Sequence, residues 1–326
     1  MKKRTDLKIY LIPLGYLLLI TMIGCAKDKE SVPELTTSPV TYVTEQSVIF
    51  TGTVTGDGGA EVTERGICWG TAHNPTTAGD KIANGTGTGS YTCTLTDLLT
   101  NTPYFVRAYA INSAGTGYGQ EMAFRTWNDE MVTDIDGNVY HTVTVGSQVW
   151  LVENLNVTHY RNGDPVELVT GNAAWEGLTT GAYCNYEHSA ANAAVYGRLY
   201  NWFAVNDDRI LAPEGWHVSS DGEWTALSGT QGGDVVAGSK LKEAGITHWL
   251  GPNADATNES GFSGLPGGYR EYGGNFTYIN WGGGWWCSTE ENCNDAVIRY
   301  MDYGAPDTWR YLEDKRYGRS VRCIKD

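Results

Sequence analysis

Basic residues are scarce in this chain. Among its 326 residues, 23 are Lys or Arg and 38 are Asp or Glu, so the formal net charge at pH 7 is −15. Proteins that bind nucleic acids neutralise phosphates with Lys and Arg, and this balance therefore argues against a nucleic-acid partner. An acidic surface suits a protein that works in solution outside the cell, and it is also compatible with calcium uptake.

Short catalytic motifs are missing as well. The sequence contains no G-x-S-x-G and no H-E-x-x-H, and none of its 6 His residues makes a pair at i, i+4. The run Gly282-Gly283-Gly284 does not join a strand to a helix, so a phosphate-binding loop is not expected. His217, which follows Trp216, is expected in the core or at its rim. We therefore predict no enzyme activity, no catalytic residue and no cofactor.

Phenylalanine is rare, whereas other aromatic residues and glycine are abundant. The chain has 6 Phe against 12 Trp and 20 Tyr, together with 41 Gly. This composition favours loop-rich β structure over a helical bundle. The stretch from Gly261 to Cys323 is dense in Trp, Tyr and Gly and poor in Leu, Ile and Val. It predicts several short strands joined by structured loops, with aromatic rings supplying most of the burial.

The N-terminus predicts export and lipidation. Lys2, Lys3 and Arg4 give the chain a positive start. The mainly apolar run that follows, Ile9 to Ile23, is too short and interrupted for a stable membrane-spanning helix. The run ends Met22-Ile23-Gly24-Cys25, which resembles a bacterial lipobox. This resemblance implies that residues 1–24 are a lipoprotein signal peptide and that Cys25 carries the lipid. It also implies an outer-membrane protein held by its lipid anchor and exposed at the cell surface, with residues 25–35 as a tether. The alternative is an ordinary signal peptide with an unmodified Cys25.

Residues 36–127 predict a β-sandwich, because apolar residues alternate in short runs separated by Gly, Asn and Asp clusters. The residues that alternate are Val48, Phe50 and Gly52; Ile67 and Trp69; Tyr91, Cys93 and Leu95; and Tyr104, Val106 and Ala108. The run from Leu98 to Tyr104 resembles the corner of fibronectin type III domains, in which the Tyr hydroxyl bonds back to the preceding loop. We expect a domain of seven strands that folds alone and acts as a spacer, followed by a hinge at residues 127–130.

Residues 131–326 carry several family-type motifs. They are QVWLVENL from Gln148, YGRLYNW from Tyr196, GFSGLPGGYR from Gly261, WWCSTE from Trp285 and YGRSVRC from Tyr317. Together they resemble the Fibrobacter succinogenes major paralogous domain (FISUMP) of bacterial surface lipoproteins. The resemblance implies an α+β, C-type-lectin-like fold after a mainly β first half. Ser219 or Ser220 is expected to cap a helix with Glu223, and Trp224, Leu227 and Leu241 are expected in the core.

A hairpin or a weak calcium site is expected at the start of this domain. Asp134, Asp136 and Asn138 stand at i, i+2 and i+4, as in half of a calcium loop. The flanking apolar alternation favours a hairpin instead, since Asp-Gly-Asn is a turn signal, and no acid follows at the bidentate position. Calcium is therefore a possible but weak cofactor, and no other metal is expected.

The aromatic residues near the C-terminus are the candidate ligand contacts, because Tyr and Trp give a large contact area at low entropic cost. The predicted binding residues are Trp281, Trp285, Trp286, Tyr300, Tyr303, Trp309 and Tyr311. The expected function is a surface protein that presents a lectin-like domain to a glycan or a protein. The alternatives are a purely structural protein, in which these rings are core, and an oxidative enzyme of the formylglycine-generating type that uses Cys287 and Cys293.

The cysteines predict two disulfides, because exported chains pass an oxidising compartment. The resemblance to FISUMP places Cys184 and Cys323 at family-type positions, which implies a bond between them. Cys287 and Cys293 flank a turn-like segment and are expected to form a local bridge. Cys68 and Cys93 are expected on opposite faces of the sandwich sheets and should remain thiols.

Overall fold

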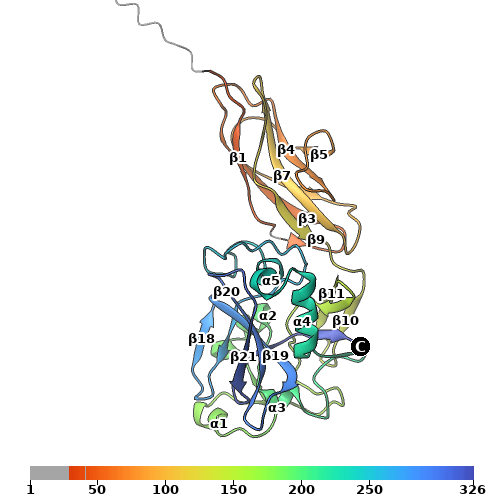
Figure 1. The fold of residues 1–326 in the computed structure, drawn as a ribbon, viewed down its shortest axis with the longest axis vertical. Coiled ribbons are helices and arrows are strands. Elements are labelled where there is room, and N and C mark those ends of the chain that lie inside the picture. The colour runs from red at the N-terminus through yellow and green to blue at the C-terminus, as the bar shows by residue number, and fades with distance from the viewer. Residues whose placement is uncertain (1–28, 41) are drawn as a thin grey trace, which may run out of the picture.

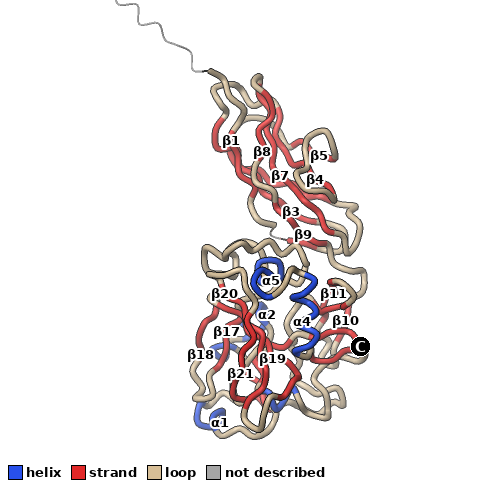
Figure 2. Tube along the Cα trace, in the orientation of Figure 1, coloured by secondary structure: helices blue, strands red, loops and turns tan. Residues whose placement is uncertain are grey.

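The chain folds into a β-sandwich followed by a larger domain that mixes sheets and helices (Figure 1). The computed structural model describes residues 29–40 and 42–326, so the lipobox prediction at Cys25 lies outside the described residues. Within that part, no helix has both the length and the apolar character needed to cross a bilayer. Figure 2 shows helices in the second domain and none in the first.

The N-terminal domain consists of two antiparallel sheets. Its strands are β1 (Glu34–Thr37), β2 (Tyr42–Val43), β3 (Val48–Gly56), β4 (Glu64–Gly70), β5 (Asp80–Ala83), β6 (Gly89–Leu95), β7 (Pro103–Asn112), β8 (Gly115–Tyr118) and β9 (Met122–Arg125). One sheet has the order β1-β3-β2 with β6 also on β3, and the other has β5-β4-β7-β8 with β9 on β7. The predicted sandwich is confirmed, but it has nine strands rather than seven, because short strands such as β1 and β2 leave no period-two signal.

The predicted inward faces form the core of this domain. Val48, Phe50, Ile67, Tyr91 and Cys93 belong to one buried cluster. The residues Leu95, Tyr104, Val106 and Ala108 belong to it as well, and Trp69 packs against it. The corner is also present, because the Leu99 N–H donates to the Tyr104 hydroxyl over 3.0 Å. The alternation of apolar residues was therefore sufficient to identify this core.

The C-terminal domain contains three sheets and five α-helices. The strands are β10 (Met131–Thr133), β11 (Val139–Val145), β12 (Gln148–Leu151), β13 (Glu167–Leu168), β14 (Ala182–Cys184), β15 (Leu199–Tyr200), β16 (Trp216–Val218), β17 (Gly267–Arg270), β18 (Phe276–Ile279), β19 (Gly282–Glu290), β20 (Asp295–Asp302), β21 (Trp309–Asp314), β22 (Ser320–Val321) and β23 (Cys323–Lys325). The helices are α1 (Asn172–Glu176), α2 (Ala190–Tyr196), α3 (Trp202–Val205), α4 (Asp221–Thr230) and α5 (Asp234–Leu241), with a 3-10 turn η1 (Tyr186–His188).

The strand orders place the chain ends of this domain together. One sheet runs β10-β11-β12-β23-β16, a small one runs β13-β14-β15, and the third runs β18-β17-β19-β20-β21 with β22 beside β19. The last strand β23 therefore lies between β12 and β16, and Lys325 pairs with Glu130 at 2.7 Å. We call the third sheet the aromatic sheet; α4 packs on β19 and β20 and also contacts α5.

Local signals predicted from the sequence recur in this domain. Ser220 and Glu223 form a capping box at the start of α4. Trp224, Leu227 and Leu241 are fully buried in one core cluster. His217 lies partly exposed between two carboxylates, with Nε2 at 2.8 Å from Glu223 and Nδ1 at 2.7 Å from Asp326. These positions agree with the expectation of a helix cap, a core face and a rim histidine.

The segment expected to be a hinge is tied to both domains. The Trp127 N–H donates to the Thr44 carbonyl, and the Asn128 N–H donates to the Thr142 carbonyl on β11. The Trp127 ring lies 4.1 Å from the ring of His141 and packs against the core of the C-terminal domain. An aromatic ring and backbone hydrogen bonds therefore hold this segment against both domains.

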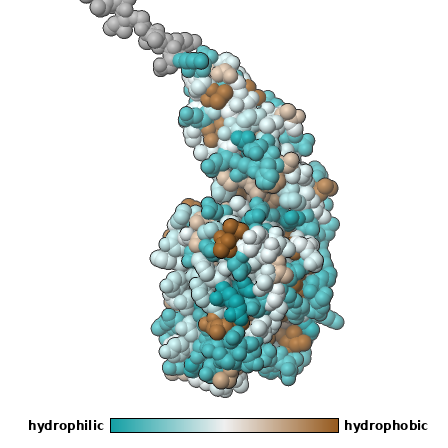
Figure 3. All heavy atoms as spheres, viewed as in Figure 1, coloured by the Kyte–Doolittle hydropathy of each residue, from teal (hydrophilic) through white to brown (hydrophobic). Residues whose placement is uncertain are grey.

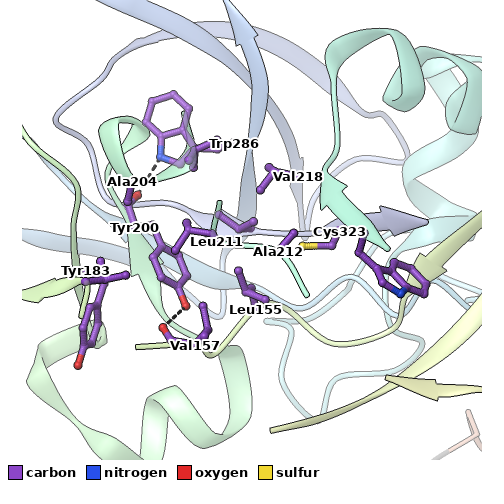
Figure 4. Close-up of a cluster of buried hydrophobic side chains, with 14 of the residues drawn as sticks. Leu155, Val157, Tyr183, Tyr200, Ala204, Leu211, Ala212, Val218, Trp286 and Cys323 are labelled. Atoms are coloured by element: carbon purple, nitrogen blue, oxygen red, sulfur yellow. Dashed lines mark hydrogen bonds between the residues drawn. The ribbon is translucent and has the colours of Figure 1, made fainter. Parts of the chain in front are cut away.

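The six described cysteines are free thiols, so the two predicted disulfides are not formed. Cys184 belongs to the cluster around Trp175, whereas Cys323 lies in a different cluster with Leu211, Ala212 and Val218 (Figure 4). Cys287 is buried on β19, whereas Cys293 is exposed in the turn that follows. The predicted disulfide pairings are wrong because a family-type position and the spacing in sequence do not determine which hydrophobic cluster a side chain enters.

Cys68 and Cys93 do remain thiols on different faces, as expected. Cys93 lies in the sandwich core, while the Cys68 thiol approaches the Pro75 carbonyl in the loop that covers the outer side of β4. Burial raises the pKa of Cys68 to about 11, so this thiol stays protonated at neutral pH.

Candidate binding surface

The aromatic sheet has one face against helices and one face that is partly open. Because paired residues of neighbouring strands share a face, the pairs Tyr300–Trp309 and Ile298–Tyr311 place Tyr300, Trp309 and Tyr311 on one side. Trp285 pairs with Arg299 on the opposite side, against α4. Ligand contacts are therefore expected on the open side of the sheet.

Two of the seven predicted ligand contacts are core residues instead. Trp285 and Trp286 are both 0% exposed. The Trp285 indole donates to Asn154 Oδ1 over 2.7 Å, and the Trp286 indole donates to the Tyr200 carbonyl over 2.9 Å. Figure 4 shows Trp286 inside the buried cluster. As neighbours on one strand they enter the cores on either side of the sheet, so the prediction that they bind a ligand was wrong.

The other five rings lie at the surface. Trp281 is 48% exposed and Tyr311 is 49% exposed. Tyr300, Tyr303 and Trp309 are partly buried. The Trp281 and Tyr303 rings meet at 5.3 Å, and Tyr300 contacts both Trp309 and Tyr311. These five residues therefore remain candidates, in two groups.

Four further tyrosines extend the first group, and they were missed in the sequence. They are Tyr269, Tyr272, Tyr278 and Tyr317. Tyr272 is 44% exposed and Tyr278 is 47% exposed. For the first three, the available signal was the Gly- and Tyr-rich run from Gly267 to Trp281, in which β17 and β18 form a hairpin too short for alternation to show. We call these four and the five above the aromatic surface.

The aromatic surface contains seven tyrosine hydroxyls. None of the seven donates or accepts a hydrogen bond within the part of the chain that the structure describes. By contrast, the hydroxyl of Tyr196, on the neighbouring helix α2, accepts a bond from Asn280 Nδ2 over 3.0 Å. A phenol can donate and accept at once, so the surface offers apolar rings and free polar groups side by side.

Glycines make room for the floor of this surface. A Cβ at Gly282 would lie 2.0 Å from the Tyr300 hydroxyl oxygen, and one at Gly284 would lie 2.6 Å from Arg319 Nη1. Both distances are shorter than side chains tolerate, so the Tyr300 and Arg319 side chains lie directly on the β19 backbone. The run Gly282-Gly283-Gly284 thus serves close packing and not phosphate binding.

An ion pair lies in this floor. Arg319 donates to both oxygens of Glu313 over 2.5 Å through Nε and Nη2. Its guanidinium also stacks on the Tyr269 ring at 3.7 Å. The Arg319 side chain is 4% exposed and its Nη1 has no hydrogen-bond partner among the described residues. A buried donor left without a partner is costly, which makes this atom the floor's most unusual feature.

Burial keeps the floor tyrosines protonated. It raises the pKa of Tyr269 to about 12, and it also raises the pKa of Tyr300. Both hydroxyls therefore act as hydrogen-bond donors across the physiological range. The protonation state of these two tyrosines therefore changes little with pH.

Two arginines of the motifs that carry the family resemblance hold the fold together. Arg322 is fully buried and donates to the carbonyls of Leu151 and Phe262. Arg270 is also fully buried and donates to the Val169 carbonyl over 2.7 Å while stacking on Trp175. These two guanidinium groups are used up in structural bonds, whereas Tyr269 and Tyr317 of the same motifs belong to the aromatic surface.

The calcium candidates form a hairpin. β10 and β11 pair antiparallel around them. One Asp134 oxygen accepts from the N–H groups of Asp136 and Asn138, and the other accepts from the Tyr140 hydroxyl over 2.6 Å. Asp136 points elsewhere and pairs with His159 at 2.5 Å. Between residues 29 and 326, with residue 41 set aside, no three His, Cys, Asp or Glu side chains are grouped to hold a metal ion.

A hollow lies at the joint between the domains. It has a volume of about 350 Å³ and is lined by Phe124 and Trp127 on one side and by Val152, Val195 and Leu265 on the other. Exposed aliphatic side chains occur elsewhere too; Figure 3 shows a brown patch over α5, where Val235 is 68% exposed. The hollow also has polar lining residues, among them Asn156, whereas the patch over α5 is aliphatic.

Several solved structures resemble part of the chain. The sensor domain of the anti-sigma factor RsgI4 of Pseudobacteroides cellulosolvens is 22% identical, with a TM-score of 0.24, and the match covers 29% of this chain and 95% of that one. The FN1–FN3 domains of chicken CNTN1 are 23% identical over 30% of this chain and 31% of theirs, with a TM-score of 0.24. A fibronectin type III domain of the human KIAA0970 protein is 14% identical over 29% and 74%, with a TM-score of 0.23.

The C-terminal domain matches a described family. No curated protein matches the chain. Residues 143–325 match the family model of the Fibrobacter succinogenes major domain, which spans the C-terminal domain from β11 to β23. The motifs that suggested this resemblance all fall inside the matched range. The chain therefore belongs to the Fibrobacter succinogenes major domain family.

Proposed function

We propose that this protein is a non-enzymatic, lipid-anchored protein of the outer membrane that displays a carbohydrate-binding domain at the cell surface. In this proposal the C-terminal domain is C-type-lectin-like, and the N-terminal sandwich is a fibronectin type III-like spacer. Cys25 carries the lipid. The ligand lies on the aromatic surface.

The observation that carries the proposal is the combination of exposed rings and free hydroxyls. Sugars present apolar C–H faces and polar hydroxyl edges, so they need a site with both. Exposed Tyr and Trp rings supply the apolar contact and the phenol groups supply donors and acceptors. Aromatic residues are also enriched at protein–protein interfaces, so the test below includes proteins as well as glycans.

Three features support display away from the membrane. The N-terminus of the described chain lies at the far end of the sandwich from the C-terminal domain (Figure 1). The Trp127 segment is held by bonds to both domains, which fixes the direction of the head. Lipidation at Cys25 would add strong membrane affinity, since each buried methylene contributes about 0.8 kcal/mol.

Binding is tested with the purified full-length protein on an array of glycans and of extracellular matrix proteins. We expect saturable binding to at least one glycan, without release of new reducing ends. The double variant Tyr278→Ala/Trp281→Ala should lose this binding, whereas Val235→Ala on α5 should retain it. Binding to a protein alone, or binding that the double variant retains, would contradict the proposed function.

The lipid anchor has a separate test. Replacing Cys25 by Ser should remove palmitate labelling and move the protein out of the membrane fraction. Labelling that persists in the variant would show that the anchor is elsewhere.

A further inference from the structure

Six rings of the aromatic surface touch in series, and we call them the six-ring row. In order they are Tyr272, Tyr317, Tyr269, Tyr278, Trp281 and Tyr303. Successive ring centres are 5.9, 6.0, 5.6, 6.1 and 5.3 Å apart. Trp309, Tyr300 and Tyr311 form the second, separate group. A row of this kind suits a ligand that is itself a chain, because a single terminal sugar would use one or two rings.

The rings of the row do not share a plane. The angles between neighbours are 49° and 36° up to Tyr269, 12° between Tyr269 and Tyr278, and 87° and 71° across Trp281. Flat crystalline polysaccharide needs a coplanar platform, since its sugar faces lie in one plane. Rings that turn along the row fit a single chain that can twist to follow them.

The charges beside the row are largely neutralised. Arg319 is paired with Glu313, and Arg316 is paired with Asp314 at 2.6 Å. Glu271 is a further acid near Tyr269 and Tyr317. Two cations therefore face three acids, which disfavours an anionic polymer such as a polyuronate. The row favours a neutral chain whose hydroxyls bond to tyrosine hydroxyls and to the Glu313 carboxylate.

We propose that the six-ring row binds a single, neutral, linear glycan chain along its length. This inference rests on the proposed function and specifies the form of its ligand. Every contact in it comes from rings, hydroxyls and the Arg319–Glu313 pair, so binding needs no divalent ion. Tyr272, Tyr278 and Trp281 are the rings with the most exposed surface and make the main contacts.

Chain length is the variable that tests this inference. The full-length protein is titrated with cello-, xylo-, manno- and laminari-oligosaccharides of two to six sugars, and also with powdered crystalline cellulose and chitin. We expect at least one series to bind, with an affinity that rises at least tenfold from disaccharide to hexasaccharide, and to bind equally well in EDTA.

Two results about the form of the ligand would overturn the inference but leave the proposed function standing. One is equal affinity for disaccharide and hexasaccharide, which would indicate a site for a terminal sugar. The other is binding to a crystalline powder that soluble hexasaccharide does not compete away. Absence of carbohydrate binding in the series and on the glycan array would overturn both proposals. Loss of binding in EDTA would also contradict the inference.

Variants locate the chain on the row. Trp281→Ala should flatten the dependence on length, because it removes the ring that joins Tyr278 to Tyr303. Leu312→Ala is the matched control, since Leu312 is 47% exposed against 48% for Trp281 but lies outside the aromatic surface. Melting temperatures of both variants should stay near that of the unchanged protein. An equal loss of affinity in both variants would place the ligand elsewhere on the sheet.

Discussion

The tyrosines of the sandwich and those of the aromatic surface are used in different ways. In the sandwich, each tyrosine from Tyr91 to Tyr118 has a bonded hydroxyl: Tyr91 donates to the Gly66 carbonyl, Tyr104 accepts from the Leu99 N–H, Tyr109 donates to Glu64 and Tyr118 bonds to Thr77. On the aromatic surface none of the seven hydroxyls has such a partner in the described chain. The first set stabilises the fold, and the second set is available to a ligand.

The same contrast exists among tryptophans only a few residues apart. Trp281 is half exposed, whereas Trp285 and Trp286 are fully buried with bonded indoles. Composition alone would treat the three as equivalent. A dense aromatic stretch thus contains both core and surface residues. Whether the polar atom of a ring is hydrogen-bonded within the chain distinguishes the two.

Tryptophan truncation should separate core from surface most strongly. Trp285→Ala removes a fully buried indole and leaves Asn154 without one of its donors, so it should lower the free energy of unfolding by about 3–5 kcal/mol. Trp281→Ala should change it by less than about 1 kcal/mol. Urea denaturation of both variants measures the difference. A large loss of stability in Trp281→Ala would mean that this ring is core after all.

Hydroxyl removal should give a smaller difference of the same kind. Tyr104→Phe removes the acceptor of the Leu99 N–H and should destabilise the sandwich by about 1–2 kcal/mol. Tyr278→Phe should have no measurable effect on stability, because its hydroxyl has no partner in the described residues. Guanidinium denaturation followed by circular dichroism measures both. A matching loss in Tyr278→Phe would indicate a structural bond at this hydroxyl.

The smallest expected effect is the pH response of one ion pair at the domain joint, His141 with Glu153. The hydrogen bond to Glu153 raises the pKa of His141 above its ordinary value of 6.5. Its stabilising contribution is therefore fully present below pH 6.5 and is lost as the pH rises through the raised pKa. Because His141 and Glu153 are partly exposed, the loss should stay below about 1 kcal/mol.

The difference in unfolding free energy between the unchanged protein and His141→Gln isolates this contribution. The difference should shrink between pH 6 and pH 8.5, while glycan affinity stays flat over the same range. A difference that grows with pH would have the wrong sign.

Sequence patterns predicted those parts of the fold that have a regular period or a local rule. The sandwich strands followed from alternation, and the α4 start followed from Ser220 and Glu223. The Asp134 turn and the Tyr104 corner also depend on neighbours in sequence. The pairing of cysteines, the contacts of Trp127 and the burial of Trp285 depend on which elements meet in space, and no short-range pattern encodes that.

The candidate site was predicted in part for the same reason. Composition identified Trp281, Tyr303 and Tyr311, because they lie in a stretch rich in aromatic residues. Composition could not separate the exposed rings of that stretch from the buried ones. Tyr272 and Tyr317 were missed, because they meet only when the β17–β18 hairpin lies beside the segment after β21. Arg319 looked like a motif residue, and its unpaired Nη1 became visible only with its neighbours in place.

Ring-specific NMR tests the central claim most directly. The full-length protein with labelled tyrosine ring carbons is titrated with the hexasaccharide that binds best. The account predicts saturable shifts for Tyr272, Tyr278 and their neighbours in the six-ring row, and unchanged signals for Tyr91, Tyr104 and Tyr109. Shifts in the sandwich tyrosines, with the six-ring row silent at saturation, would contradict it.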